Sequence, residues 1–139
     1  MAKNRINYGS QFIDKDDIQS VIKSLKSKNI TNGTFVKKFQ KNLEKYLNVK
    51  HVSVCNSGTS ALELAMIAIG LKSNDNIILP SINFVASANI VKRFNANIFF
   101  CDIDENTGQI NHELVQRCVE KNNLKKIKAI IAMYNGGYP

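Results

Sequence analysis

Short apolar runs that alternate with longer amphipathic stretches constrain the fold of this chain more than any other feature. The runs cover residues 51–55, 76–79, 98–101 and 127–133. Strands that alternate with helices at this spacing form a largely parallel sheet. The last run has the continuous apolar centre AIIAM, which is typical of a strand covered on both faces. The sequence therefore predicts an α/β fold, with helices on both faces of a mainly parallel sheet.

Apolar residues at three- and four-residue intervals predict the helices. Asp14 or Asp16 should cap the first helix, and Asn48 should end the second. In the turn between these two helices, Gly33 should supply a positive φ and Thr34 should cap the second helix. The expected helices cover about residues 14–28, 34–48, 59–70, 84–94 and, capped by Asn111, 111–119.

The stretch 51–71, HVSVCNSGTSALELAMIAIGL, predicts a strand, a tight turn and a helix, and the turn is the best candidate for chemistry. A helix that starts after the 56–58 turn presents unpaired backbone N–H groups and the positive end of its dipole. Together with the hydroxyls of Ser57, Thr59 and Ser60, these groups suit a phosphate. Small polar residues also cap helices without binding anything, so the residues alone favour a cap over a phosphate site.

Charge, cysteine content and isolated polar residues exclude several function classes. The 139 residues contain 19 Lys and Arg against 11 Asp and Glu, which gives a net charge of +8. The lysines follow the polar positions of the helices, which favours a solvated face over a nucleic-acid surface. Three cysteines without CxxC spacing predict reduced thiols that fill the core. His51 and His112 are isolated, and Asp102 and Asp104 favour a turn, so no metal site is expected.

No apolar run reaches the length of a membrane span or of a signal-peptide core, so the chain is expected to be soluble and cytoplasmic, without a membrane partner. The last residues, YNGGYP, directly follow the fourth predicted strand. A glycine-rich turn usually leads into another element, which favours a chain cut in mid-fold over a short tail. Such a chain would expose apolar surface and dissolve poorly.

Five blocks of sequence resemble the DegT/DnrJ/EryC1/StrS family of pyridoxal-phosphate-dependent sugar aminotransferases. They keep the family's order and cover nearly the whole chain: YGSQFID from Tyr8 with Asp17-Ile18, SKNITNG from Ser27, NSGTSALELA from Asn56, PSINFVASAN from Pro80 and CDIDENTGQI from Cys101. The opening blocks are most similar to the branch that aminates 4-keto sugar nucleotides on the way to pseudaminic-type nonulosonic acids. The resemblance implies an incomplete large domain of the aspartate aminotransferase (type I) fold over residues 34–139, preceded by an N-terminal arm and helix over 1–33.

The resemblance also implies site residues. In the family a Gly-Thr-Ser turn holds the phosphate of pyridoxal 5'-phosphate, which gives this role to Gly58, Thr59 and Ser60. Phe84 matches the aromatic residue that stacks on the pyridine ring, although its residue type alone predicts a core position. Substrate contacts correspond to Tyr8, Lys28, Asn29, Ile30, Thr31 and Ser57, whose residue types alone predict a structural arm and turn.

No catalytic residue can be assigned. Such an enzyme needs a lysine that forms a Schiff base with the cofactor and an acidic residue that keeps the pyridine nitrogen protonated. In the family both lie beyond the strand at 127–133, and no lysine here has the family's Ser-x-x-Lys context. The terminal block, 133–139, also lacks the His and Gly-Gln that many members carry. The 139 residues are therefore expected to be inactive alone.

A sugar nucleotide, glutamate as amino donor and a homodimeric partner are implied for the full-length form. The alternative is a stand-alone, non-catalytic module that binds a phosphorylated ligand through the turn at residues 56–60. Continuation of the reading frame beyond Pro139 with an Asp and a Ser-x-x-Lys would distinguish the two hypotheses.

Overall fold

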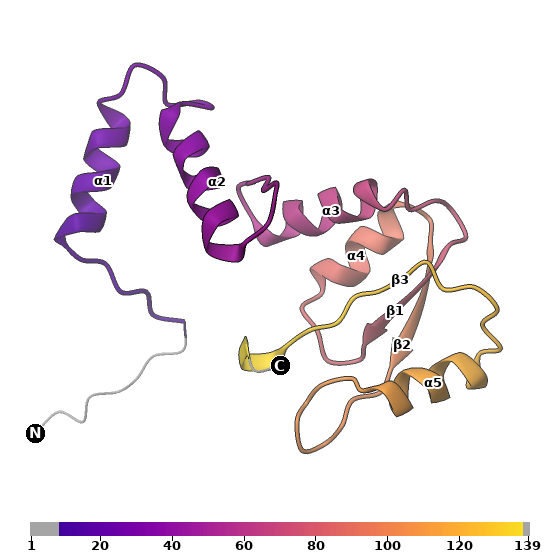
Figure 1. Ribbon diagram of the computed structural model, residues 1–139. Coiled ribbons are helices and arrows are strands. Elements are labelled where there is room, and N and C mark those ends of the chain that lie inside the picture. The colour runs from indigo at the N-terminus through magenta and orange to yellow at the C-terminus, as the bar shows by residue number, and fades with distance from the viewer. Residues whose placement is uncertain (1–8, 138–139) are drawn as a thin grey trace, which may run out of the picture. The chain divides into compact units, whose positions relative to one another are not determined.

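The computed structural model describes residues 9–137, and the chain forms two packed units, Met1–Val54 and Cys55–Pro139 (Figure 1). The elements are α1 (Lys15–Leu25), α2 (Thr34–Leu47), α3 (Gly58–Ala68), β1 (Asn76–Pro80), α4 (Ala86–Arg93), β2 (Asn97–Cys101), α5 (His112–Lys121), β3 (Ala129–Ile130) and the short 3-10 helix η1 (Asn135–Gly137). The domain boundary expected after residue 33 stays a prediction, because packed units and domains need not share boundaries.

The helix ends of the first unit follow local sequence signals. The Asp14 carboxylate accepts the N–H groups of Asp16 and Asp17 at 2.8 and 3.0 Å, and the Asp17 carboxylate accepts the Asp14 N–H at 3.1 Å. This reciprocal pair is a capping box, and it selects Asp14 from the two predicted caps. Asn48 ends α2 in the left-handed conformation with φ 52°, as predicted.

The turn between α1 and α2 differs from the prediction. Gly33 has φ −74°, and the positive φ falls on Asn32 at 50°. A Cβ at Gly33 would overlap the backbone carbonyl of Asn29, so the glycine is required by close backbone approach. Gly33 is also the N-cap of α2, which leaves Thr34 as the first helical residue without a capping hydrogen bond. The prediction that Thr34 caps this helix is wrong.

The second unit contains the predicted parallel sheet, in the order β2-β1-β3. Ile77 and Leu79 of β1 pack with residues of α3 and α4, including Met66 and Ile90. Ile78 points to the opposite face and packs with Cys101 and with Cys118 of α5. Helices therefore cover both faces of the sheet, as Figure 1 shows with α3 and α4 on one side and α5 on the other.

Of the four predicted strands, one does not form and one is shorter than predicted. Residues 51–55 form no strand, and within 127–133 only Ala129–Ile130 pair with β1. A strand needs a hydrogen-bonded neighbour, and within residues 9–137 no segment pairs with 51–55 or with the outer edge of β3. Ile130 is 45% exposed, so the prediction that this last strand is covered on both faces is wrong for this chain.

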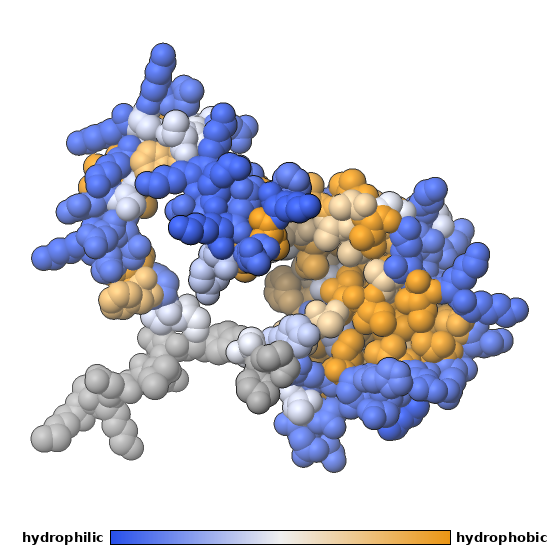
Figure 2. All heavy atoms as spheres, in the orientation of Figure 1, coloured by the Kyte–Doolittle hydropathy of each residue, from blue (hydrophilic) through white to orange (hydrophobic). Residues whose placement is uncertain are grey.

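Apolar side chains gather on the viewer's side of the second unit in Figure 2. Its exposed large apolar residues include Leu64, Ile67, Ile82, Phe100 and Ile130. The expected exposure of apolar surface is therefore present, and poor solubility stays a prediction. Within the described part of the chain, no helix combines the length and the hydrophobicity that crossing a membrane requires.

Candidate functional site

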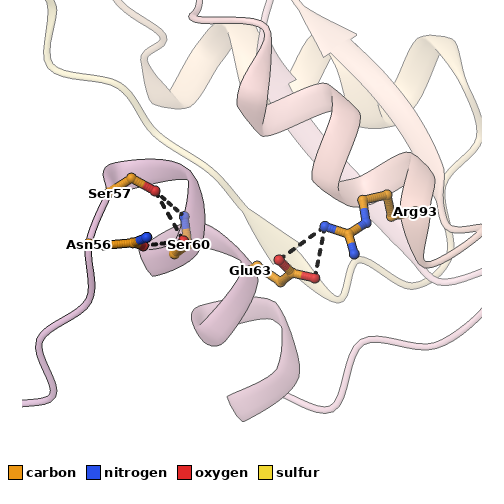
Figure 3. Close-up of polar contacts among 5 residues, drawn as sticks. All are labelled: Asn56, Ser57, Ser60, Glu63 and Arg93. Atoms are coloured by element: carbon orange, nitrogen blue, oxygen red, sulfur yellow. Dashed lines mark hydrogen bonds and ion pairs between the residues drawn. The ribbon is translucent and has the colours of Figure 1, made fainter. Parts of the chain in front are cut away.

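The turn before α3 is built by three polar side chains (Figure 3). Ser57 is the N-cap, and its Oγ accepts the Ser60 N–H at 3.1 Å. The Ser60 hydroxyl donates to Asn56 Oδ1 at 2.9 Å, and the two serine hydroxyls lie 3.0 Å apart. Ser57 therefore caps the helix, which is the role that its residue type alone favours. The role of Asn56 as acceptor of the Ser60 hydroxyl was not predicted, although an amide side chain directly before the cap was the available signal.

The cap leaves part of the helix end open. The Ala61 N–H donates to the Ser57 carbonyl at 3.0 Å, whereas the N–H groups of Gly58 and Thr59 have no acceptor among residues 9–137. A Cβ built on Gly58 would meet nothing within 4 Å, so the space beside the first residue of the helix is open. Two free donors at the positive end of a helix dipole fit the phosphate of pyridoxal phosphate. Capping and phosphate binding are thus compatible in this turn.

The same edge of the sheet carries an exposed aromatic side chain. Figure 1 shows the N-terminal ends of α3 and α4 on the side toward which the β1 arrow points. The turn that follows β1 contains Phe84, which is 70% exposed, so the core position predicted from its residue type is wrong. The preceding residue, Asn83, has a buried Nδ2 with no hydrogen-bond acceptor in the described chain. Asn83 was not predicted, because its only signal in the sequence is that a polar residue directly precedes Phe84.

All lysines of the second unit lie at the opposite, amino edge of the sheet. Each sits at or beyond the C-terminal end of a helix or directly before β3, and they are Lys72, Lys92, Lys121, Lys125, Lys126 and Lys128. Hydrogen bonds locate this edge: the Lys128 N–H donates to the Asn76 carbonyl, and Asn76 Nδ2 donates to the Lys126 carbonyl, both at 2.8 Å. Because helices between parallel strands run against the strands, no lysine of this unit approaches Gly58.

The residues predicted to contact substrate are divided between the units. Residues 28–31 form an exposed turn of the first unit, where the Ser27 hydroxyl donates to the Asn29 carbonyl at 3.1 Å. Ser57 belongs to the second unit. Tyr8 lies outside the described residues. Substrate binding by these residues stays a prediction.

Other polar groups at the carboxyl edge have structural roles. Asp104 Oδ1 accepts the N–H groups of Asn106 and Thr107 at 3.0 and 2.9 Å, and the backbone hydrogen bond from Thr107 lowers the pKa of this carboxyl. Asp104 is therefore a turn former, as predicted. Among residues 9–137 there is no group of three or more His, Cys, Asp or Glu that could hold a metal ion.

Two of the three cysteines are buried, whereas all three were predicted to fill the core. Cys101 and Cys118 are buried, as expected, whereas Cys55 is exposed. Its core position was predicted from the strand expected at 51–55, and this segment has no pairing partner in the described chain.

Comparison with known proteins decides the family. The model of the DegT/DnrJ/EryC1/StrS aminotransferase family matches residues 11–139. The chain belongs to this family. It is 38% identical over 132 residues to the UDP-4-amino-4,6-dideoxy-N-acetyl-beta-L-altrosamine transaminase of Campylobacter jejuni, which covers 95% of this chain and 34% of that enzyme. The chain spans about a third of the length of the curated relatives it matches.

Solved DegT/DnrJ/EryC1/StrS structures share the fold. Helicobacter pylori PseC, an aminotransferase involved in the biosynthesis of pseudoaminic acid, is 33% identical with a TM-score of 0.75, over 87% of this chain and 32% of that one. Spr1654 of Streptococcus pneumoniae, a proposed sugar aminotransferase in its PMP form, is 26% identical with a TM-score of 0.81, over 91% and 31%. Spr1654 is also known in a PLP form. The predicted α/β fold, as part of a type I pyridoxal-phosphate enzyme, is confirmed, and the family is pyridoxal-phosphate-dependent.

Proposed function

We propose that this chain forms the phosphate-binding part of a pyridoxal-phosphate-dependent aminotransferase, which transfers an amino group from glutamate to a 4-keto sugar nucleotide. The observation that carries the proposal is the open end of α3, where the N–H groups of Gly58 and Thr59 have no acceptor among residues 9–137 and the space beside Gly58 is free. Family membership and similarity to a sugar-nucleotide transaminase support the reaction class.

The residues of the turn divide the work of holding the phosphate. Gly58 and Thr59 donate their N–H groups to phosphate oxygens, and the exposed Thr59 hydroxyl adds a third donor. The hydroxyls of Ser57 and Ser60 are engaged within the turn, so they hold its shape for the phosphate. Because the capping bonds fix the backbone before the ligand arrives, little ordering is needed on binding.

The aromatic ring of Phe84 offers an exposed flat surface for the pyridine ring. When bound, the cofactor supplies an electron sink that makes the carbon bearing the amino group acidic. The proton must then be moved by an amine at the same edge of the sheet. The second unit places all of its lysines at the other edge. We infer that these 139 residues bind the cofactor but do not catalyse transamination alone.

For the longer protein we propose a cytoplasmic homodimer. Its sugar nucleotide would be contacted by Tyr8, Lys28, Asn29, Ile30, Thr31 and Ser57. Similarity to the altrosamine transaminase over these sequence blocks supports the assignment. The proton-transferring lysine and the acid facing the pyridine nitrogen would come from chain beyond Pro139.

Calorimetric titration with pyridoxal phosphate and with pyridoxal tests the proposed site. Two charge-assisted hydrogen bonds are lost with the phosphate, so pyridoxal should bind at least about tenfold more weakly. Equal affinity would show that the α3 turn does not recognise the phosphate. In parallel, the chain is incubated with pyridoxal phosphate, glutamate and a uridine-diphosphate-linked 4-keto sugar. Formation of amino sugar above the protein-free control would contradict the inferred inactivity.

The location of the lysines also favours the second hypothesis, a non-catalytic module that binds a phosphorylated ligand. Both hypotheses predict phosphate binding, so the continuation of the reading frame separates them. An Asp followed by a Ser-x-x-Lys after Pro139 supports the transaminase, and a stop codon supports the module.

A further inference from the structure

Two buried thiols meet between β2 and α5, away from the α3 turn. Cys101 ends β2 and is 0% exposed, and Cys118 lies in α5 and is 7% exposed. Both belong to one core cluster with Ile78. Cys118 Sγ lies 3.7 Å from the carbonyl oxygen of Phe100, the residue directly before Cys101. The fold therefore brings together two thiols that are separated in the sequence by the loop 102–111 and the first part of α5.

The two thiols are close enough to influence each other's titration. Burial raises the pKa of the Cys101 thiol, and the neighbouring Cys118, through its charge and a side-chain hydrogen bond, raises it further. Because both cysteines pack in one cluster and Cys118 Sγ lies 3.7 Å from the carbonyl oxygen of the residue before Cys101, side-chain rotation can bring the two sulfurs together.

Only one of the two cysteines borders a surface groove. Cys118 borders a groove of about 630 Å³ whose walls also include Arg117 and Lys121, and Cys101 does not line it. Asn122 Nδ2 donates to the Cys118 carbonyl at 2.8 Å and lies 3.8 Å from its Sγ. A thiolate is the nucleophile in disulfide exchange, and the cysteine that borders the groove is the one that an oxidant meets first.

We propose that Cys101 and Cys118 form an intramolecular disulfide when the chain meets a small-molecule disulfide. The Cys118 thiolate attacks one sulfur of the oxidant, forms a mixed disulfide and releases one thiolate. Cys101 then loses its proton to water and attacks Cys118 Sγ, which forms the protein disulfide and releases the second thiolate. The two protein thiols lose two electrons and two protons, and the oxidant becomes two thiols. The bond ties the carboxyl end of β2 to α5.

A Cys55→Ser variant isolates the pair, because Cys101 and Cys118 are then the only cysteines. The variant is equilibrated with mixtures of oxidised and reduced glutathione, in native buffer and in concentrated urea, and its mass is recorded after acid quenching. In native buffer it should lose the mass of two hydrogens, with an equilibrium constant at least about tenfold above that in urea, since the fold holds the thiols together. An equilibrium constant no greater than that in urea would overturn the proposal.

Two further variants test the order of attack. Cys55→Ser with Cys101→Ser should accumulate a stable glutathione adduct on Cys118. Cys55→Ser with Cys118→Ser should react at least about tenfold more slowly, because Cys101 is fully buried. Equal rates of adduct formation in the two variants would refute Cys118 as the entry point.

Discussion

The two edges of the β2-β1-β3 sheet differ in the way they present positive charge. At the carboxyl edge, the α3 turn presents backbone donors and a helix dipole, with Phe84 in the adjacent turn. At the amino edge, the lysines of the second unit lie in the last turns of helices or in the segments before strands, and those in the last helical turns interact favourably with the helix dipole. The direction of a parallel sheet thus separates the backbone donors of the α3 turn from the side-chain amines of the lysines. The net charge of +8 says little about the phosphate site.

A substitution in the core of the sheet, between the two edges, should have the largest effect on stability. Ile78→Ala removes a side chain that is fully buried on β1, so the free energy of unfolding should fall by about 3 kcal/mol. Ile130→Ala, in the neighbouring strand, is the matched control, and it should cost about 1 kcal/mol or less because Ile130 is 45% exposed. Urea unfolding followed by circular dichroism measures both. Equal losses would mean that β1 is not the centre of the core.

The carboxyl edge can be altered by removing one backbone donor. Gly58→Pro deletes an N–H at the first helical position, where proline is tolerated, and Ser57 already has the extended conformation that precedes proline. Affinity for pyridoxal phosphate should fall about 10- to 100-fold, since a hydrogen bond to a charged group is worth about 1.5–3 kcal/mol.

Gly58→Ala is the matched control, because it keeps the N–H and its Cβ meets no atom within 4 Å. Its affinity should stay within about twofold of the original, as no donor is lost. Parallel losses in the two variants would assign the effect to the side chain rather than to the donor.

Loss of the cap should act on stability more than on binding. Ser57→Ala removes the acceptor of the Ser60 N–H, which should destabilise the chain by about 1 kcal/mol. Ser57→Asn keeps a capping oxygen and should recover most of this loss. The comparison is made by thermal unfolding, and an unchanged midpoint for the alanine variant would show that the helix end is held by other contacts.

The amino edge should matter least for the cofactor. Lys126→Gln with Lys128→Gln removes two positive charges next to Asn76, at the edge opposite the α3 turn. At 0.15 M salt such distant charges are screened, so affinity for pyridoxal phosphate should change less than about twofold. A loss similar to that of Gly58→Pro would place the phosphate at the amino edge and remove the contrast between the two edges.

Features set by neighbouring residues could be predicted from the sequence. Helical spacing located α1 and α5, and the caps at Asp14 and Asn111 follow from side chains that reach N–H groups within one turn. The segments 51–55 and 131–133 could not be predicted, because a strand depends on a partner that is distant in the sequence. A glycine was expected at position 33 for its positive φ, whereas it is required by the nearby carbonyl of Asn29. This approach could not be predicted, because it depends on how the turn folds.

In the candidate site, too, features set by neighbouring residues could be predicted and those set by distant contacts could not. The sequence located the Gly58–Ser60 turn, but only the geometry shows that capping uses the Ser60 N–H and leaves two others open. The segregation of the lysines could have been deduced from connectivity alone, because each lysine lies in the last turn of a helix or between a helix and the next strand. The contact of Cys101 with Cys118 had no local signal, as it depends on how α5 packs on β2.

Calorimetric comparison of pyridoxal phosphate with pyridoxamine phosphate tests most directly whether the chain has the phosphate site without the lysine. Both ligands carry the phosphate, and only the aldehyde can bond to an amine. If the α3 turn alone holds the ligand, the two dissociation constants should agree within about threefold, because the phosphate donors are the same. Pyridoxal phosphate that binds at least about tenfold more tightly would reveal a bonded lysine, and failure of both ligands to bind would show that the turn is only a cap.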